Sequence, residues 1–321
     1  MTTLKLGTRG SQLALFQANT TAALLKAHAG IDCEIVIIKT SGDRLAEAPL
    51  SEIGGKRLFV KELEDSLLAG DIDLAVHSSK DLPAVLPPGL TIGAVLPRED
   101  PRDAVVLPGG RLASTLPEVE AILGDAPRIG TSSVRRIAQL TRLFAGARFD
   151  PIRGNLDTRL RKLDAGDYDA LVLAAAGLRR LNHAHRISAA LPADTCVPAP
   201  GQGIIAIEIR EDDARARQRV LTIDHAETAV ALVAERAVVT RLGGGCQMPI
   251  GAYAQIEGET VRLAAIVSSL DGTREVRASA AGSRREPDGV GVRAAEALLA
   301  GGADTILAEA RQVSIDTSEQ P

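Results

Sequence analysis

The sequence predicts an α/β protein with two duplicated, doubly wound α/β domains and a small α+β C-terminal domain. Three observations lead to this prediction. The 321 residues are 45% hydrophobic and 24% charged, as in ordinary globular proteins, and this length suits two or three domains of roughly 150 residues or fewer. A pattern of strand, glycine turn and helix occurs twice. A pattern of three strands separated by tight turns follows near the C-terminus.

The duplication is diverged but visible at two pairs of segments. Residues 6–11 (LGTRGS) and 129–133 (IGTSS) each precede a predicted helix, and residues 69–76 (AGDIDLAV) match residues 165–172 (AGDYDALV). The spacing of the two pairs makes the first copy longer by 27 residues. The extra length falls near residues 40–57, a polar stretch with glycines that we expect to form a lid or a loop excursion.

The first copy alternates between strand and helix patterns. The predicted elements are strand 4–6, helix 11–28, strand 34–39, helix 61–69 and strand 72–77. Such alternation predicts parallel strands covered by helices. We expect residues 1–100 and 204–221 to form the first α/β domain and residues 101–203 to form the second.

Residues 222–321 are predicted to form the third domain. A helical apolar face begins near residue 225 and ends at Gly243. The predicted strands 250–256, 261–270 and 275–281 are separated by Glu-Gly and Asp-Gly turns, which indicates an antiparallel three-stranded sheet. A helix at about residues 289–299 would cover one face of this sheet.

Composition and charge argue against several classes of protein. The net charge of −4 and the 2% aromatic content, without tryptophan, argue against nucleic-acid binding. The longest apolar stretches, such as 170–178, fall well short of the roughly 18 residues that span a bilayer. Polar residues interrupt any signal-peptide core in residues 1–30, so we expect a cytoplasmic protein. Three cysteines without a CxxC pair predict neither a disulfide framework nor a metal site.

Arginine makes up 30 of the 37 basic residues. Because the planar guanidinium binds carboxylates and phosphates in a bidentate manner, this excess suggests an anionic ligand. A coding bias, given the many alanines and glycines, explains the count equally well. The positions of the arginines must therefore decide.

Both duplicated glycine turns bring polar residues to a helix N-terminus, where the helix dipole favours an anion. Arg9 and Ser11 lie at the first turn, and Ser133, Arg135 and Arg136 lie at the second. A capping serine alone is usually structural. Two adjacent arginines in the first turn of a helix oppose its dipole and cost stability unless an anion is nearby. We therefore expect both arginines to bind an anionic ligand.

Arg153 and Arg159 flank a further turn and helix start in the second copy. They would lie at the edge formed by the strand ends, where open α/β sheets bind ligands. The alternative is that they are surface arginines paired with Asp150 and Asp157.

A polar cluster follows the predicted strand 72–77. Residues 78–81 (SSKD) bring Lys80 and Asp81 to the carboxyl end of a buried strand, where Asp81 would stay ionised beside the ammonium group. The matching strand of the second copy ends in residues 174–177 (AAAG), so the fold does not require the polar cluster. This asymmetry favours a functional role for Asp81, although an aspartate here can also be a turn or cap residue.

Cys246 follows three glycines, where the missing side chains would let a bulky group approach the sulfur. We consider a role as an attachment site or nucleophile against the alternative of a small buried hydrophobe. Cys33 and Cys196 suit that alternative well.

Six motifs in this order resemble the porphobilinogen deaminase family, also called hydroxymethylbilane synthases, and the resemblance covers nearly the whole chain. The motifs are residues 8–14 (TRGSQLA), 76–83 (VHSSKDLP), 130–136 (GTSSVRR), 153–160 (RGNLDTRL), 201–203 (GQG) and 244–251 (GGCQMPIG). Two small departures are Ser79, where the family often has methionine, and Met248, where it often has valine.

The resemblance implies an enzyme of tetrapyrrole and heme biosynthesis, a monomeric transferase. Such an enzyme condenses four porphobilinogen units head to tail, loses one ammonia per unit, and releases hydroxymethylbilane by hydrolysis. The chain would grow on a covalent dipyrromethane cofactor, bound through a thioether to Cys246, with Asp81 as the catalytic carboxylate. The resemblance implies further cofactor-binding residues: Lys80, Ser133, Arg135, Arg136 and Arg159. It implies these substrate-binding residues: Arg9, Ser11, Arg153, Arg180 and Gln202.

A second hypothesis is a non-catalytic, two-domain solute-binding module for a small carboxylate or phosphate. Duplicated α/β halves of the periplasmic-binding-protein type, with arginines at strand ends, would serve that role too. This hypothesis gives no reason for Cys246 or for the third domain.

Overall fold

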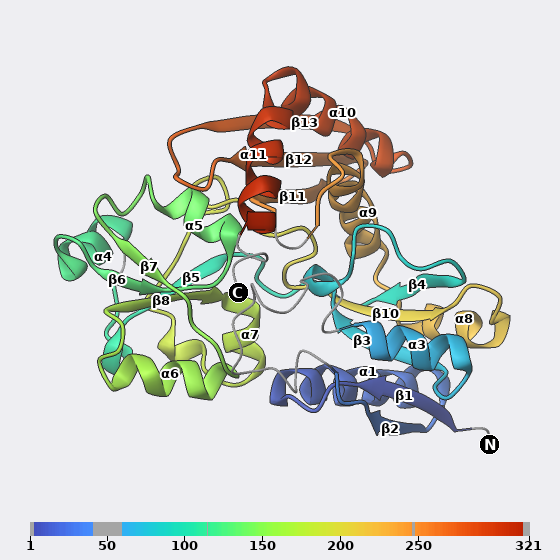
Figure 1. The fold of residues 1–321 in the computed structure, drawn as a ribbon. Helices are drawn as coiled ribbons and strands as arrows, with labels where there is room; N and C mark the ends of the chain where they lie inside the picture. The colour runs from blue at the N-terminus through green and yellow to red at the C-terminus, as the bar shows by residue number, and fades with distance from the viewer. Residues whose placement is uncertain (1–2, 41–59, 114, 246–247, 317–321) are drawn as a thin grey trace.

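The structure is a computed structural model that describes residues 3–40, 60–113, 115–245 and 248–316. Three sheets form its framework (Figure 1). The lid expected near residues 40–57 lies outside the described residues, apart from Thr40, and so does Cys246. Within the described ranges, no helix is long and apolar enough to cross a membrane.

The first sheet has five strands in the order β2-β1-β3-β10-β4. Its strands are β1 (Leu4–Thr8), β2 (Cys33–Ile37), β3 (Leu74–Ser78), β4 (Leu90–Val95) and β10 (Ile205–Arg210). Helices α1 (Gln12–Ala29) and α8 (Ala214–Val220) bury apolar residues against one face. Helix α3 (Lys61–Ala69) buries Leu63 and Leu67 against the other, as a doubly wound domain requires.

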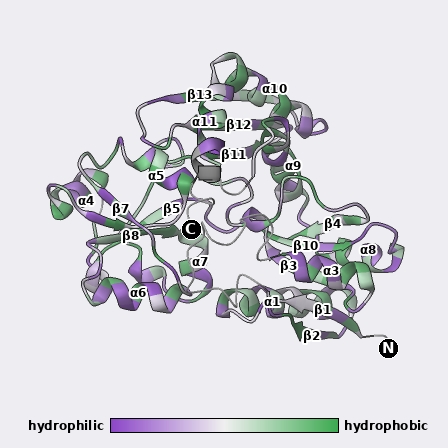
Figure 2. Ribbon diagram, in the orientation of Figure 1, coloured by the Kyte–Doolittle hydropathy of each residue, from purple (hydrophilic) through white to green (hydrophobic). Residues whose placement is uncertain are grey.

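The second sheet repeats this arrangement in the order β7-β6-β8-β5-β9. Its strands are β5 (Asp103–Val106), β6 (Arg128–Gly130), β7 (Arg148–Asp150), β8 (Ala170–Ala174) and β9 (Ala189–Ala190). Its helices are α4 (Leu116–Leu123), α5 (Val134–Leu140), α6 (Leu156–Asp164) and α7 (Ala175–Arg180). Hydrophilic and hydrophobic residues alternate along α6, as expected for a helix with one buried face (Figure 2).

The two sheets confirm the predicted duplication. Strands β1 and β6 occupy the same place in their sheets, and each carries one of the two matched glycines. A Cβ atom on Gly7 would collide with Ile72, and one on Gly130 would collide with Leu171. Close packing therefore requires glycine at the same point of both copies.

Each sheet contains one antiparallel strand, which differs from the parallel arrangement predicted. Strand β10 runs antiparallel to β3 and β4, and β5 runs antiparallel to β8 and β9. The reason is that the chain passes between the two sheets twice, from β4 to β5 and from β9 to β10. It leaves one domain at the carboxyl ends of the parallel strands and enters the other at the same end. The entering strand must therefore run in the opposite direction.

The third domain contains the predicted antiparallel sheet. Its strands β11 (Ile250–Glu257), β12 (Thr260–Ser268) and β13 (Glu275–Ser283) pair in that order. Helices α9 (Ala226–Arg241) and α10 (Pro287–Ala300) pack with it around one apolar core. The sequence did not predict α11 (Ala303–Asp316), which adds Ile306 and Leu307 to this core. Short 3₁₀ helices occur at Ser79–Asp81, Pro108–Gly110, Ala184–Arg186 and Leu221–Ile223.

Candidate active site

The two segments that cross between the α/β domains are bonded to each other. The N–H of Glu99 donates to the carbonyl oxygen of Gly203 (3.0 Å), and the N–H of Leu96 donates to that of Ile205 (3.0 Å). Gly203 has φ +87°, and a Cβ atom there would collide with the carbonyl oxygen of Glu99. Only glycine fits at this close approach of two backbones. The junction is thus a close pairing of two backbone segments, and Gln202 and Arg180 contact it.

Asp103, the first residue of β5, is fully buried and binds two arginines of α5. Arg135 donates from Nη1 to Oδ2 (2.7 Å) and from Nη2 to Oδ1 (3.2 Å), and Arg136 donates from Nε to Oδ1 (2.9 Å). Burial alone would raise the pKa of Asp103, but the two guanidinium groups outweigh it and hold that pKa well below its usual range. Asp103 is therefore a carboxylate in the folded protein.

This pairing supplies an anion near the first turn of α5. Sequence reasoning assigned that anion to a ligand and missed Asp103, which is 32 positions from Arg135. Each arginine also donates to a backbone carbonyl, that of Val197 for Arg135 (2.8 Å) and that of Val172 for Arg136 (2.8 Å). Two cations face one carboxylate, so the group keeps a net positive charge.

Gln202 connects this group to the first domain. Its Nε2 donates to Oδ1 of Asp103 (2.9 Å), and its Oε1 accepts from Nζ of Lys80 (3.4 Å). Lys80 lies in the 3₁₀ helix that follows β3. Burial and the nearby Arg136 lower the pKa of Lys80 to about 8. The structure therefore brings four predicted cofactor or substrate residues, Lys80, Arg135, Arg136 and Gln202, into one network.

Arg159 belongs to the same electrostatic group. It lies in the first turns of α6, and its Nε donates to the carbonyl oxygen of Gly154 (2.9 Å). Burial, followed by the charges of Arg136 and Arg153, lowers the pKa of Arg159 to about 10. Cations that lower one another's pKa values repel each other, and a bound anion would remove that repulsion. We call Lys80, Arg135, Arg136, Arg153 and Arg159 the cationic cluster.

The alternative for Arg153 and Arg159 was pairing with Asp150 and Asp157. The described residues show no such ion pair. Asp150 pairs instead with Arg128 (3.2 Å) and Arg148 (2.8 Å). Asp157 pairs with His183 (3.0 Å). These carboxylates are therefore engaged elsewhere.

Asp81 ends the 3₁₀ helix and is exposed. Its charge raises the pKa of both Lys80 and Arg159, against the stronger effects that lower them. A carboxylate that incoming molecules can reach therefore lies beside the cationic cluster.

The other predicted residues have more varied surroundings. Ser11 caps α1, because its Oγ accepts the N–H of Ala14 (3.3 Å). Ser133 is the N-cap residue of α5 but makes no capping side-chain bond within the described structure. Arg9 is half-buried just after β1. Arg180 donates from Nη2 to the carbonyl oxygen of Gly203 (2.7 Å), and burial lowers the pKa of Arg180 to about 10.

Sequence reasoning also missed a buried ion pair that joins the junction to the third domain. Glu235 of α9 is fully buried and accepts from Nη1 of Arg98 (2.5 Å), from the N–H of Gly201 (2.7 Å) and from the N–H of Ala254 (2.8 Å). Arg98 also donates from Nε to the carbonyl oxygen of Gln202 (2.9 Å). The only signal in the sequence is a glutamate on the apolar face of a predicted helix.

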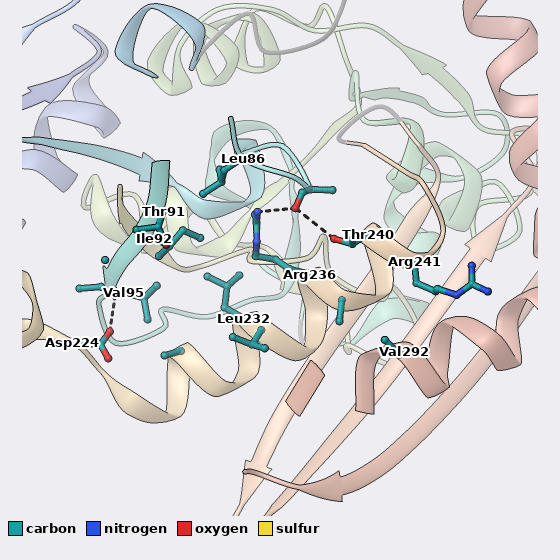
Figure 3. A pocket seen from close by; sticks show the side chains of 16 residues that line it. Leu86, Thr91, Ile92, Val95, Asp224, Leu232, Arg236, Thr240, Arg241 and Val292 are labelled. Atoms are coloured by element: carbon teal, nitrogen blue, oxygen red, sulfur yellow. Dashed lines mark hydrogen bonds between the residues drawn. The ribbon is translucent and has the colours of Figure 1, made fainter. Parts of the chain in front are cut away.

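A pocket of about 740 Å³ lies away from these residues, between β4 and the helices α9 and α10 (Figure 3). Its lining is mainly apolar and includes Leu86 and Leu232. Beside it, Arg236 donates from Nη2 to the carbonyl oxygens of Pro83 (2.9 Å) and Ala84 (2.8 Å), which ties the segment after Asp81 to α9. None of the predicted site residues that the structure describes lines this pocket, so we do not take it as the candidate site.

The fold and the site together define a class: a protein of two α/β domains with a cationic cluster at their junction, suited to a ligand with several carboxylates. Residues 4–218 match the family described as "Porphobilinogen deaminase, dipyromethane cofactor binding domain", and residues 229–300 match "Porphobilinogen deaminase, C-terminal domain". The chain belongs to the porphobilinogen deaminase family.

Curated relatives agree with this assignment. The chain is 46% identical over 310 residues to the porphobilinogen deaminase of Geobacter metallireducens, and the aligned region covers 96% of this chain and 95% of the relative. It is 47% identical over 315 residues to that of Moorella thermoacetica, covering 98% of each. Among solved structures, the periplasmic VFT2 domain of Bordetella pertussis BvgS matches with a TM-score of 0.40 and 17% identity, over 68% of this chain and 85% of that domain.

Proposed function

We propose that this chain is a working porphobilinogen deaminase. It would join four porphobilinogen units head to tail, release one ammonia per unit, and free hydroxymethylbilane by hydrolysis. The observation that supports this most is the cationic cluster beside an exposed Asp81, in a chain that matches the family from residue 4 to residue 300 with a short gap.

The residues present fit a dipyrromethane cofactor. That group carries carboxylate side chains, and burial and neighbouring positive charges lower the pKa values of Lys80 and Arg159, so a bound carboxylate would stabilise both cations. We assign its binding to Lys80, Ser133, Arg135, Arg136 and Arg159. When bound, it supplies the pyrrole to which the first substrate unit is joined.

We assign the covalent attachment of the cofactor to the sulfur of Cys246, which lies outside the described residues. The preceding residue supports this assignment. A Cβ atom on Gly245 would meet nothing within 4 Å in the described structure, so a bulky group has room beside this backbone.

Asp81 is the proposed catalytic residue. As ammonia leaves a porphobilinogen unit, positive charge develops on the substrate ring, and a carboxylate that accepts the pyrrole N–H stabilises it electrostatically. The same carboxylate can move protons at the departing amine and at the ring carbon that forms the new bond. Its exposure lets substrate reach it directly.

We assign substrate binding to a second group of residues near the junction. Every porphobilinogen unit brings an acetate and a propionate, so a growing chain accumulates negative charge that arginine is suited to bind. The assigned residues are Arg9, Ser11, Arg153, Arg180 and Gln202. Two of them lie at the junction: Gln202, in one crossover segment, donates to the carbonyl oxygen of Pro101 in the other (2.7 Å), and Arg180 donates to that of Gly203 (2.7 Å).

The proposal includes the domain boundaries 1–100 with 204–221, 101–203, and 222–321. They are supported by sheet membership, since β10 joins the first sheet although it follows the second in sequence. It also includes a cytoplasmic monomer whose partners are porphobilinogen and its oligopyrrole intermediates, with no nucleic acid or membrane.

The experiment that tests the function is intact-mass measurement after brief exposure to porphobilinogen. We expect a covalent adduct on the purified protein and a ladder of masses above it, each step one porphobilinogen less one ammonia. The solute-binding alternative allows neither an adduct nor a ladder. A purified chain of unmodified mass that stays unmodified with porphobilinogen would contradict our proposal.

Two arginines of the cluster should separate binding from folding. Arg159→Gln removes one cation from a repelling group, so we expect an unchanged or slightly higher unfolding temperature and a roughly tenfold higher KM for porphobilinogen. Arg136→Gln is the matched variant, because it takes a partner from buried Asp103 and should cost about 3–5 kcal/mol of stability. Equal losses of stability in both variants would refute this distinction.

A further inference from the structure

The C-terminal helix α11 contacts the end of α9, just before the cysteine-bearing segment. Arg311 donates from Nη2 to the carbonyl oxygens of Leu242 (3.1 Å) and Gly243 (3.2 Å). Helix α11 lies beyond residues 229–300, the part that matches the family's C-terminal domain. In Figure 1, α11 is directed from the third domain toward the two α/β domains.

The end of α9 leaves these carbonyl groups available. Gly243 has φ +61°, its N–H donates to Thr240 (3.1 Å), and the N–H of Gly244 donates to Val239 (3.1 Å). This is the Schellman arrangement, which uses two of the helix's last carbonyl groups. Arg311 binds the carbonyl oxygen of Leu242, the C-cap residue, and that of Gly243 directly after it. A guanidinium group at the negative end of a helix dipole is also favourable.

The described residues directly after the C-cap of α9 are three glycines. Gly243, Gly244 and Gly245 provide no side chains to pack. The next described contacts are those of Met248, whose N–H donates to the carbonyl oxygen of Gly245 (3.0 Å), and of β11. Cys246 follows Gly243 by three positions in the sequence, so the chain leads directly from the backbone group that Arg311 binds to this cysteine.

Helix α11 itself is held independently of Arg311. Ile306, Leu307 and Ala310 are buried, the first two within the apolar core of the third domain. Arg274 forms an ion pair with Glu309 on the same helix. Loss of Arg311 should therefore leave α11 in place.

We propose that Arg311 is a positioning residue for the reaction. By fixing the carbonyl groups of Leu242 and Gly243, it sets where the chain presents Cys246 to the cationic cluster during cofactor attachment and elongation. This inference rests on the proposed function.

The test compares three variants of the full-length holoenzyme. Arg311→Met should lower kcat for ladder formation about tenfold while KM for porphobilinogen stays within twofold. Arg311→Lys keeps a cation near the carbonyl groups and should recover at least a third of the wild-type kcat. Arg274→Met is the matched control, because it removes a different polar contact of α11 but leaves the contact with α9. Its kcat should stay within twofold of wild type, whatever its unfolding temperature.

A second readout does not depend on activity. Amide hydrogen exchange of residues 243–245 should be at least tenfold faster in Arg311→Met than in wild type and unchanged in Arg274→Met. If wild type forms no ladder, the proposed function fails, and the exchange data still decide whether Arg311 fixes this segment. Wild-type kcat and exchange in Arg311→Met, or equal slowing in Arg274→Met, would overturn the inference.

Discussion

Replacing Asp81 with alanine is expected to leave a folded, cofactor-bearing protein whose ladder forms roughly 10²- to 10³-fold more slowly, by analogy with the loss of one electrostatic stabiliser from an active site. The carboxylate is exposed and outside the buried network of Asp103, so its loss should cost little stability. What it removes is the negative charge that faces the substrate ring as ammonia leaves. The same charge raises the pKa of Lys80 and Arg159, so both cations should lose protons more readily in the variant.

Two companion variants separate charge from shape at this position. Asp81→Asn keeps the size and a hydrogen-bond acceptor but loses the charge, and should be nearly as slow as Asp81→Ala. Asp81→Glu keeps the charge at a shifted position and should retain a small part of the activity. The ladder is followed by intact mass over time at saturating porphobilinogen. A full-speed ladder in Asp81→Ala would show that another group carries the chemistry.

The sequence predicted those features of the fold that depend on local pattern. The glycine turns at Gly7 and Gly130 follow from close packing at one point of each sheet, and the three-stranded sheet of the third domain follows from turn residues between short strands. Helix α11 was not predicted. Gly301 and Gly302 indicate only the end of the preceding helix, and the apolar face of α11 is too short to stand out in the sequence.

Features that depend on distant residues could not be read from the sequence. The antiparallel direction of β5 and β10 arises from the path of the chain between two domains, which strand periodicity does not encode. Asp103 is the first residue of an apolar strand and resembles an ordinary strand-start residue, yet it neutralises part of the predicted cationic site. The positions of the arginines were predicted, but their internal partner was not.

The same distinction explains why Glu235 was overlooked. Its partners are Arg98, 137 positions away, and two backbone N–H groups from different domains. A buried carboxylate with a charged partner and several donors is a costly arrangement that is easily broken by one substitution. Its position links the junction, where Gln202 reaches the cationic cluster, to α9, which leads to Cys246.

The largest single effect is expected from Cys246→Ala, which should lose both the covalent adduct and the ladder. The attachment requires a sulfur that can act as a thiolate, and the other two cysteines are unsuited to it. Cys196 is buried, and its burial, followed by the charge of Asp103 beside it, raises its pKa to about 12. Burial also raises the pKa of Cys33, which lies in an edge strand of the first sheet.

Intact mass of the purified variants decides the assignment. Cys33→Ala is the matched control and should keep the adduct in full, while Cys246→Ser keeps the size of the side chain and should still lack it. Without the cofactor's carboxylates the cationic cluster keeps its net positive charge, so Cys246→Ala should also unfold at a lower temperature than the loaded wild type. Adding Arg159→Gln should recover part of that loss, because it removes one of the repelling cations. An adduct that persists in Cys246→Ala would place the attachment on another residue and remove the basis for the role of Arg311.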